Sequence, residues 1–286
     1  MQVRSLRSYC KINLFLDVGR KINKLKLHDI RSLIFLINIF DEIYVKKNKL
    51  SKDVVKFKGP FSSHVNNYDN SIKKSLSLLK EKGFIKQNQN YNVSIKKNIP
   101  VFSGLGGGSS NASSIIKYFL KGKKLSYKNL NYFTKVLGSD LRVFFKSSRI
   151  LQQSLFNIKN LKKNYKYYFI LVYPHLRCST KEIYSRLKVF KGINRKNLYE
   201  PKSKVKFAYN LKFEQNSLQR IVCAKFPVIQ KILFELASTK GCCFSRISGS
   251  GSACFGVFLN KKAADLGVKK IKKKFPRYWC VVTRTI

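Results

Sequence analysis

The stretch VFSGLGGGSSNASSII, residues 101–116, places four of the chain's 15 glycines within five consecutive positions. Directly after these glycines, apolar residues recur at helical spacing, and Gly122 stands where a helix C′ residue is expected. A glycine-rich turn that opens a helix is a natural phosphate cradle, because backbone N–H groups converge there and the helix dipole adds positive potential. The residues of the helical repeat are Ala112, Ile115, Ile116, Phe119 and Leu120.

Two familiar nucleotide-binding loops do not fit this stretch. It contains no G-K-[ST], which excludes a Walker A loop, and Ser109 stands where the dinucleotide fingerprint needs Gly or Ala. The alternative without a ligand is a tight turn followed by a helix, which Ser109 and Ser110 could cap. Three consecutive glycines are costly to order, so we favour a phosphate site, where the two serines could contact phosphate.

Composition bounds the class of protein. With 286 residues and 44% hydrophobic content, the chain can fold as one large or two modest domains. The net charge of +46 is compatible with a nucleic acid or another polyanion as partner. However, the lysines are spread along the whole chain and no known nucleic-acid-binding motif accompanies them, so compositional drift toward AT-rich codons is the favoured explanation.

Cysteines, histidines and apolar runs bear on the compartment. The seven cysteines are odd in number and lack C-x-x-C spacing, which favours a reducing, cytoplasmic environment. The three histidines lie far apart in the sequence, so no metal-site motif is visible. The apolar run at 33–40 is too short to span a bilayer, and the first residues lack the apolar core of a signal peptide. We therefore expect a cytoplasmic protein with no resident metal and no membrane association.

The first half of the chain predicts strands and helices around the glycine loop. Residues 8–18 alternate strictly, which predicts a strand with one polar, usable face that includes Lys11 and Asn13. An apolar run at 31–45 and a strand at 91–97 precede the loop. A second helix is expected from Ser126 to Gly138, with Leu130, Phe133 and Leu137 buried.

The second half predicts the order β-α-β-β-α-β with extra helix inserted, which suits a ferredoxin-like domain. Its first helix opens with a capping box from Ser179 to Glu182, and residues 227–241 form an amphipathic helix with Pro at its start. We place the boundary in the basic stretch 146–166, which gives domains at residues 1–155 and 156–286. The expected strands lie at 167–174, 242–248, 253–259 and 279–285, and a lysine-rich helix lies at 261–274.

Two further residues are candidates for chemistry. Asp140, in LGSDLRVFF, is the only acidic residue between Glu81 and Glu182, and the surrounding lysines favour its ionised form. Such a carboxylate could act as a base for a hydroxyl nucleophile, although a structural acid that caps a turn is the alternative. Lys11 lies within an otherwise neutral strand; taken alone, it could equally be a lysine that protects a strand edge.

Four segments together resemble the GHMP kinase superfamily, which includes galactokinase, homoserine kinase and mevalonate kinase. They are KINLFLDVG, PVFSGLGGGSSNASS, LGSDLRVFF and RISGSGSACFGVF, and they occur in the family's order over nearly the whole chain. Their form is most similar to the members that phosphorylate the 2-hydroxyl of a cytidine-diphosphate-linked methylerythritol, in the non-mevalonate route to isoprenoid precursors. The resemblance implies an α+β fold of two domains, with an N-terminal half like ribosomal protein S5 domain 2 and a ferredoxin-like C-terminal half.

The resemblance also implies roles for individual residues. Lys11 matches the catalytic lysine, and Asp140 matches the aspartate that takes the proton from the substrate hydroxyl. ATP is implied as the phosphoryl donor, with Mg²⁺ carried on its phosphates and no metal ligand implied among the side chains. The ATP-binding loop corresponds to Pro100, Val101, Phe102, Ser103, Gly104, Leu105, Gly106, Gly107, Gly108, Ser109 and Ser110. The substrate-binding positions correspond to Asn13, His28, Thr180, Tyr184, Gly249 and Gly251, with His28 and Tyr184 at the cytosine.

This chain departs from the family pattern at several positions. Leu27 stands where the family has a tyrosine before His28, which leaves one wall of the cytosine site unassigned. Phe102 and Ser103 replace residues that are often small, and Arg142 replaces a common proline.

Two alternatives stay open at this point. One is another GHMP kinase, for a sugar, homoserine or a mevalonate-like alcohol, although His28 and Tyr184 favour the cytidine substrate. The other is a polyanion-binding protein, although Lys11, Asp140 and the glycine loop favour a kinase. We expect a small-molecule substrate, no specific nucleic-acid partner, and a monomer or a homodimer.

Overall fold

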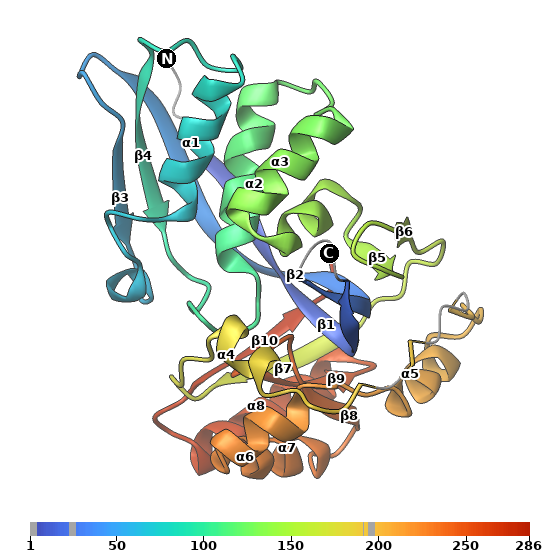
Figure 1. Cartoon of the computed structure of the whole chain (residues 1–286). Coiled ribbons are helices and arrows are strands. Elements are labelled where there is room, and N and C mark those ends of the chain that lie inside the picture. The colour runs from blue at the N-terminus through green and yellow to red at the C-terminus, as the bar shows by residue number, and fades with distance from the viewer. Residues whose placement is uncertain (1–4, 23–26, 191, 194–197) are drawn as a thin grey trace. The chain divides into compact units, whose positions relative to one another are not determined.

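The computed structural model describes residues 5–22, 27–190, 192–193 and 198–286 and divides into two compact units (Figure 1). The first unit comprises the described residues up to Cys10 together with Ile39–Val101 and Gly106–Lys146. The second comprises the described residues of Lys11–Asn38, Phe102–Leu105 and Ser147–Ile286. The units therefore interleave along the chain, and the glycine loop contributes residues to both.

The first unit is a sheet with helices packed on it. β4 pairs parallel with β3 and antiparallel with β2, in which Glu42 lies opposite Lys96. Its elements are β3 (Val54–Lys58), η1 (Ser62–His64), α1 (Ser71–Glu81), β4 (Asn90–Lys96), α2 (Gly107–Leu120), α3 (Tyr127–Leu137) and η2 (Ser139–Phe145), with parts of β1 (Ser5–Ile22) and β2 (Leu27–Asn48).

The core of the first unit lies between this sheet and its three α-helices. Ile43 of β2 and Ile95 of β4 are fully buried against Ile72 of α1, Ile115 of α2 and Phe133 of α3. The expected helix cap holds as well, because the Ser126 hydroxyl accepts from the backbone N–H of the third residue after it. The buried stripe of α2 thus fixes the helix that begins at the glycine loop.

The second unit contains an antiparallel sheet in the order β10-β7-β9-β8. The chain order β7-α4-β8-β9-α8-β10, with α5, α6 and α7 inserted after α4, confirms the predicted ferredoxin-like arrangement. Its elements are β5 (Arg149–Gln152), β6 (Ile158–Asn160), β7 (Tyr168–Tyr173), α4 (Thr180–Ser185), α5 (Lys204–Lys212), α6 (Gln219–Lys225), α7 (Val228–Ala237), β8 (Cys242–Ile247), β9 (Cys254–Phe258), α8 (Lys261–Lys274) and β10 (Trp279–Arg284).

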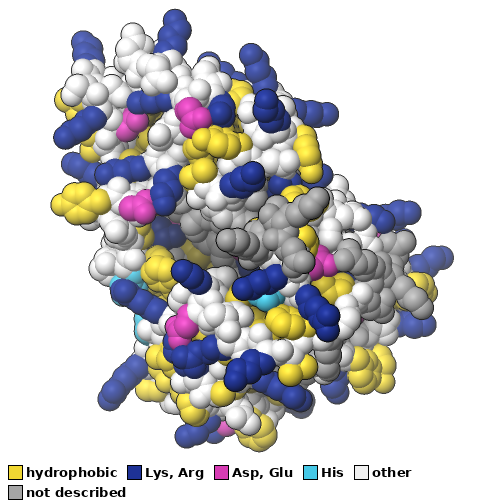
Figure 2. All heavy atoms as spheres, viewed as in Figure 1, with side chains coloured by type: hydrophobic (Ala, Val, Ile, Leu, Met, Phe, Trp, Pro, Cys, Tyr) yellow, Lys and Arg dark blue, Asp and Glu magenta, His cyan; other side chains and the backbone are white. Residues whose placement is uncertain are grey.

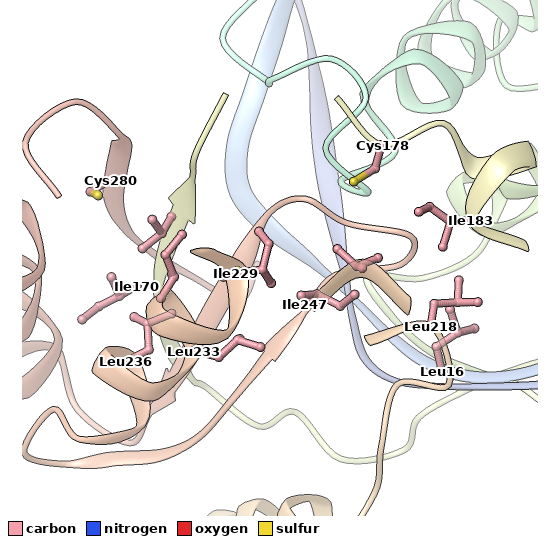
Figure 3. Close-up of a cluster of buried hydrophobic side chains, with 14 of the residues drawn as sticks. Leu16, Ile170, Cys178, Ile183, Leu218, Ile229, Leu233, Leu236, Ile247 and Cys280 are labelled. Carbon is pink, nitrogen blue, oxygen red and sulfur yellow. The ribbon is translucent and has the colours of Figure 1, made fainter. Parts of the chain in front are cut away.

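Helices α7 and α8 pack on this sheet and enclose the second core. Figure 3 shows Ile229, Leu233 and Leu236 of α7 together with Ile170 of β7 in one cluster of buried apolar side chains. The same cluster includes Leu16 of β1, so the strand that carries Lys11 is anchored in this core.

One feature of β1 differs from the sequence expectation. The strand itself is confirmed and extends beyond 8–18 at both ends, but its polar face is enclosed rather than open to solvent. Lys11, Asn13 and Phe15 are all buried. A lysine that protects a sheet edge must reach water, so this alternative for Lys11 is excluded.

The surface bears on the charge and on membranes. On the face drawn in Figure 2, Lys and Arg side chains are scattered over the surface instead of gathered into one patch. Within the part of the chain that the structure describes, no helix is long and apolar enough to cross a bilayer. The division at residue 155 stays a prediction, because the compact units follow spatial proximity rather than consecutive sequence.

Candidate active site

The first part of the glycine loop, residues 102–105, is held in place through its own four backbone carbonyls. Each carbonyl accepts one hydrogen bond from the second unit. The four donors, in the order of the carbonyls, are the backbone N–H of Cys178 (3.2 Å), that of Ala253 (3.0 Å), the hydroxyl of Ser248 (3.0 Å) and the backbone N–H of Lys11 (3.0 Å). The carbonyl oxygens are thus turned into the protein, as a loop that approaches phosphate oxygens requires.

Gly104 is the point of closest approach in this part of the loop. It has a φ of +78°, and a Cβ there would lie 2.0 Å from the Ser248 carbonyl oxygen. Its neighbour Phe102 also has a positive φ, of +56°, and its side chain is about half exposed. Only glycine fits at position 104, because any side chain would force the 102–105 segment away from Ser248.

The second part of the loop opens α2 in the first unit. Gly106, with a φ of +70°, is the N-cap residue in place of a serine, and it makes no side-chain cap bond. The capping role considered for Ser109 and Ser110 is therefore wrong. The buried Ser110 hydroxyl instead donates to the Tyr9 carbonyl at 2.6 Å and accepts from the Ser8 hydroxyl at 2.7 Å. The N-cap glycine and the Ser110 hydroxyl thus do not occupy the N–H groups at the start of α2, as suits an anion site.

Gly107 and Gly108 differ in their surroundings. A Cβ at Gly107 would lie 3.0 Å from Ile99 Cγ2 and 3.2 Å from Lys97 Nζ. At Gly108 it would meet only the Ser71 hydroxyl, at 3.8 Å. The helix start is therefore tightly packed on one side and more open on the other.

Asp140 lies in η2, directly after α3. Gly138, with a φ of +101°, turns the chain, and a Cβ there would lie 4.0 Å from Ser109 Oγ, so η2 begins beside the first turn of α2. Asp140 is half-buried, and Arg142, the departure from proline, is buried, with its guanidinium bonded to the Asn131 side chain. The arginine thus anchors η2, the segment that carries Asp140, to α3.

A buried polar network surrounds Lys11 in the second unit. The Lys11 ammonium, on a residue only 3% exposed, donates to Asn13 Oδ1. Asn13 Nδ2 in turn donates to the Ser32 hydroxyl at 2.8 Å, and the backbone N–H of Asn13 donates to Ser248 Oγ at 3.2 Å. Every member of this network is hydrogen-bonded, which restrains the position of the Lys11 side chain.

The 248–251 turn lies against this network. Gly249 has a φ of +54°, and a Cβ there would lie 3.2 Å from Lys11 Nζ, from Asn13 Oδ1 and from the Gly104 carbonyl oxygen. Asn216 holds the turn, because its Nδ2 donates to the Gly249 carbonyl at 2.8 Å. Asn216 was not singled out from the sequence. The structure thus brings Lys11, Asn13, Gly104 and Gly249 together.

The remaining predicted substrate residues also lie in the second unit. Thr180, at the start of α4, has its hydroxyl 3.0 Å from that of Ser250, next to Gly249 and Gly251. The Ser179 hydroxyl accepts from the backbone N–H of Glu182, which confirms the predicted helix start. The Glu182 carboxylate pairs with Lys225, and hydrogen bonding to this ammonium lowers the pKa of Glu182.

His28 and Tyr184 lie together, with a third ring beside them. The imidazole centroid is 5.5 Å from that of Tyr184 and 5.3 Å from that of Phe190, whose ring is stacked at 26°. Nδ1 of His28 lies 2.9 Å from the Gly19 carbonyl oxygen, which can only accept, so Nδ1 carries a proton and donates this bond; in the neutral form of the ring, Nε2 is then an acceptor. Leu27, which stands in place of the family tyrosine, is 48% exposed. Phe190 was not predicted from the sequence as part of this group.

Comparison with known proteins identifies the family. Residues 70–141 match the GHMP kinases N terminal domain, and residues 202–277 match GHMP kinases C terminal. A 4-diphosphocytidyl-2-C-methyl-D-erythritol kinase from Pelagibacter ubique is 33% identical over 98% of both chains. That of Wolbachia pipientis is 31% identical over 98% of this chain and 100% of its own.

A solved structure has the same fold. The crystal structure of a 4-(cytidine 5'-diphospho)-2C-methyl-D-erythritol kinase superposes with a TM-score of 0.74 at 21% identity, over 99% of this chain and 100% of its own. The predicted two-domain GHMP kinase fold is thereby confirmed. By the identity and coverage of its sequence relatives, the chain belongs to the 4-diphosphocytidyl-2-C-methyl-D-erythritol kinase family of GHMP kinases.

Proposed function

We propose that this protein transfers the γ-phosphoryl group of ATP to the 2-hydroxyl of 4-(cytidine 5'-diphospho)-2-C-methyl-D-erythritol, in the non-mevalonate route to isoprenoid precursors. The observation that carries this proposal is full-length similarity to kinases named for that substrate, at up to 33% identity. The proposed reaction forms a bond between the substrate oxygen and the γ-phosphorus, breaks the bond to the β-phosphate oxygen, and releases ADP.

ATP is proposed to bind along residues 100–110. The inward-turned carbonyls of 102–105 support this assignment, because they do not present oxygens to the phosphates. The start of α2 at Gly107 supports it as well, because the first N–H groups of a helix have no partner within the helix. Mg²⁺ would be carried on the phosphates and would neutralise charge during transfer. No cluster of three His, Cys, Asp or Glu that could hold a metal occurs among the described residues.

Asp140 and Lys11 are assigned to the chemical step. Asp140 would accept the proton of the substrate hydroxyl as its oxygen attacks phosphorus. Lys11, whose ammonium is fixed by Asn13, would stabilise the negative charge that develops during transfer. Positioning and electrostatics account for most of the rate gain in phosphoryl transfer, so a rigid Lys11 suits this role.

The cytosine is assigned to the group of His28 and Tyr184. With Nδ1 held by the Gly19 carbonyl, Nε2 of neutral His28 can accept from the exocyclic amine of cytosine. A uracil presents a carbonyl oxygen at that position and cannot donate to Nε2. Tyr184 would stack on the base, while Asn13, Thr180, Gly249 and Gly251 would line the rest of the substrate site.

Two further assignments complete the proposal. We assign the N-terminal family domain to residues 1–155 and the C-terminal one to residues 156–286. We also propose that the protein is located in the cytoplasm. Each of the seven cysteines lies among the described residues and is a thiol rather than part of a disulfide, as a reducing compartment allows.

The decisive experiment is an ADP-release assay with the purified chain, Mg·ATP and a panel of acceptors. The cytidine-diphosphate methylerythritol is compared with its uridine analogue, galactose, homoserine and mevalonate. Turnover with the cytidine substrate well above all others supports the proposal. Preferred turnover of another alcohol would assign a different GHMP kinase, and absence of turnover together with salt-dependent binding of random DNA would favour a polyanion-binding protein.

A further inference from the structure

An ion pair in the first unit is buried beside the two segments that flank the glycine loop, residues 98–99 and the start of α2 at Gly107. Asp41, on β2, is fully buried, and Lys97, which follows β4, is only 3% exposed. The Lys97 ammonium donates to Asp41 Oδ2. Burying two charges costs several kcal/mol per ion before they attract each other, and apolar side chains of the same volume often serve stability as well or better. The fold alone therefore gives little reason for this pair.

Asp41 holds the segment that enters the loop. Its Oδ1 accepts from the backbone N–H of Asn98 at 2.7 Å and from that of Ile99 at 2.9 Å. The Asn98 side chain adds a bond to the Phe40 carbonyl at 3.1 Å. The two residues that precede Pro100 are thus clamped to β2 by three hydrogen bonds.

Lys97 lies against the other end of the same loop. A Cβ at Gly107, the first residue of α2, would lie only 3.2 Å from Lys97 Nζ and 3.0 Å from Ile99 Cγ2. Since Asp41 neutralises the ammonium, Lys97 adds little net potential to the helix start. What the pair does provide is a fixed distance between the loop entry at 98–99 and the helix start at Gly107.

We propose that Asp41 and Lys97 are positioning residues for the ATP-phosphate loop. The inference rests on the proposed assignment of residues 100–110 to ATP. The pair sets the two ends of the loop so that its backbone donors and the start of α2 meet the phosphates together. Small errors in such placement are costly, since a misplacement of about 1 Å can lower a rate about 100-fold.

The chain contains a matched control at the opposite end of β4. Lys80 pairs with Asp53 at 2.8 Å, and Asp53 Oδ1 also accepts a backbone N–H, that of Tyr91 at 2.8 Å. This pair is largely buried and lies in the same unit, but it braces the start of β4 and not the loop. A purely structural role predicts similar consequences for both pairs.

The test replaces each pair by neutral side chains of similar size, so that no lone charge stays buried. The variants are Asp41→Asn with Lys97→Met, and Asp53→Asn with Lys80→Met. Each folded protein is titrated with Mg·ATP by calorimetry, melted to obtain its Tm, and assayed for KM toward both substrates. Single Lys97→Met and Lys80→Met proteins provide a second comparison.

For the pair at the loop we expect the Mg·ATP dissociation constant and the KM for ATP to rise roughly 10- to 100-fold. The KM for the cytidine substrate should stay within about twofold, and the control pair should lower Tm without changing ATP affinity. Unchanged ATP affinity in the loop-pair variant, or equal losses in both double variants, would overturn the inference. Wild-type protein that binds ATP but ignores the cytidine substrate would refute only the proposed substrate, and wild-type protein that binds no ATP would refute both.

Discussion

Replacing Gly104 by alanine tests how the glycine loop is held. The residue has a φ of +78°, which costs an L-amino acid about 1–2 kcal/mol. In addition, the new Cβ would lie 2.0 Å from the Ser248 carbonyl oxygen, where an ordinary contact needs at least 3.4 Å. The two backbone segments must separate, which weakens the bond from Ser248 Oγ to the Gly104 carbonyl and that from the Ala253 N–H to the Ser103 carbonyl.

The expected loss of stability follows from the left-handed backbone at position 104 and from the two weakened hydrogen bonds. Each hydrogen bond contributes about 0.5–1.5 kcal/mol, so the free energy of unfolding should fall by about 2–5 kcal/mol in total. The Mg·ATP dissociation constant should rise at least roughly tenfold, because the loop leaves its position beside Ser248. Denaturant unfolding measures the first quantity and calorimetric titration the second.

Gly83→Ala is the matched control. This glycine has a similar φ of +72°, but nothing lies within 4 Å of the added Cβ. The control should therefore lose only the backbone cost of about 1–2 kcal/mol and keep its affinity for ATP. If Gly104→Ala is no less stable than Gly83→Ala, or binds ATP as wild type does, the close contact with Ser248 does not hold the loop.

Five further substitutions, at four residues, test the assigned roles. Asp140→Asn should reduce turnover at least roughly 100-fold in the ADP-release assay while calorimetry shows unchanged Mg·ATP affinity; near-normal turnover would remove Asp140 as the base. Tyr184→Ala should raise the KM for the cytidine substrate roughly 5- to 150-fold, from about 1–3 kcal/mol of stacking, and Tyr184→Phe should be mild; an unchanged KM would place the base elsewhere. Phe190→Ala should also raise the KM for the cytidine substrate, because the Phe190 ring stacks on His28 and would flank a cytosine bonded in the plane of that imidazole. Leu27→Tyr should leave this KM unchanged or lower it. A KM that rises in Leu27→Tyr but not in Phe190→Ala would contradict this assignment.

The elements with strong local signals were predictable from the sequence. Strict alternation identified β1, and the capping serines Ser126 and Ser179 marked the starts of α3 and α4. The glycine loop predicted the start of α2, because the conformation of such a loop depends on residues within a few positions of one another. Short-range physics of this kind is contained in the local sequence, and the order of elements in the second unit followed from it.

The supports of the site were not predictable, because they depend on contacts between distant residues. Asn216 holds the turn at Gly249, which is 33 residues away. Asp41 bonds to Asn98 and Ile99, which are 57 and 58 residues away. An isolated Asn or Asp has no local pattern that distinguishes a buried brace from a surface residue. The same reason hid Phe190, which becomes meaningful only where its ring stacks on His28.

The few acidic residues suggest how so basic a chain keeps a defined site. There are 13 acids against 59 lysines and arginines, so each carboxylate has many competing cations. Nevertheless, Asp41 pairs with Lys97 beside the glycine loop. Glu182 pairs with Lys225, which lowers the pKa of Glu182, and this pair connects α4 to α6. α4 carries Tyr184, so the second pair fixes the proposed stacking wall as the first fixes the proposed ATP loop. Substitutions toward lysine can add charge at the surface at little cost. Replacing Asp41 or Glu182 in this way would instead break an ion pair that holds a part of the proposed site.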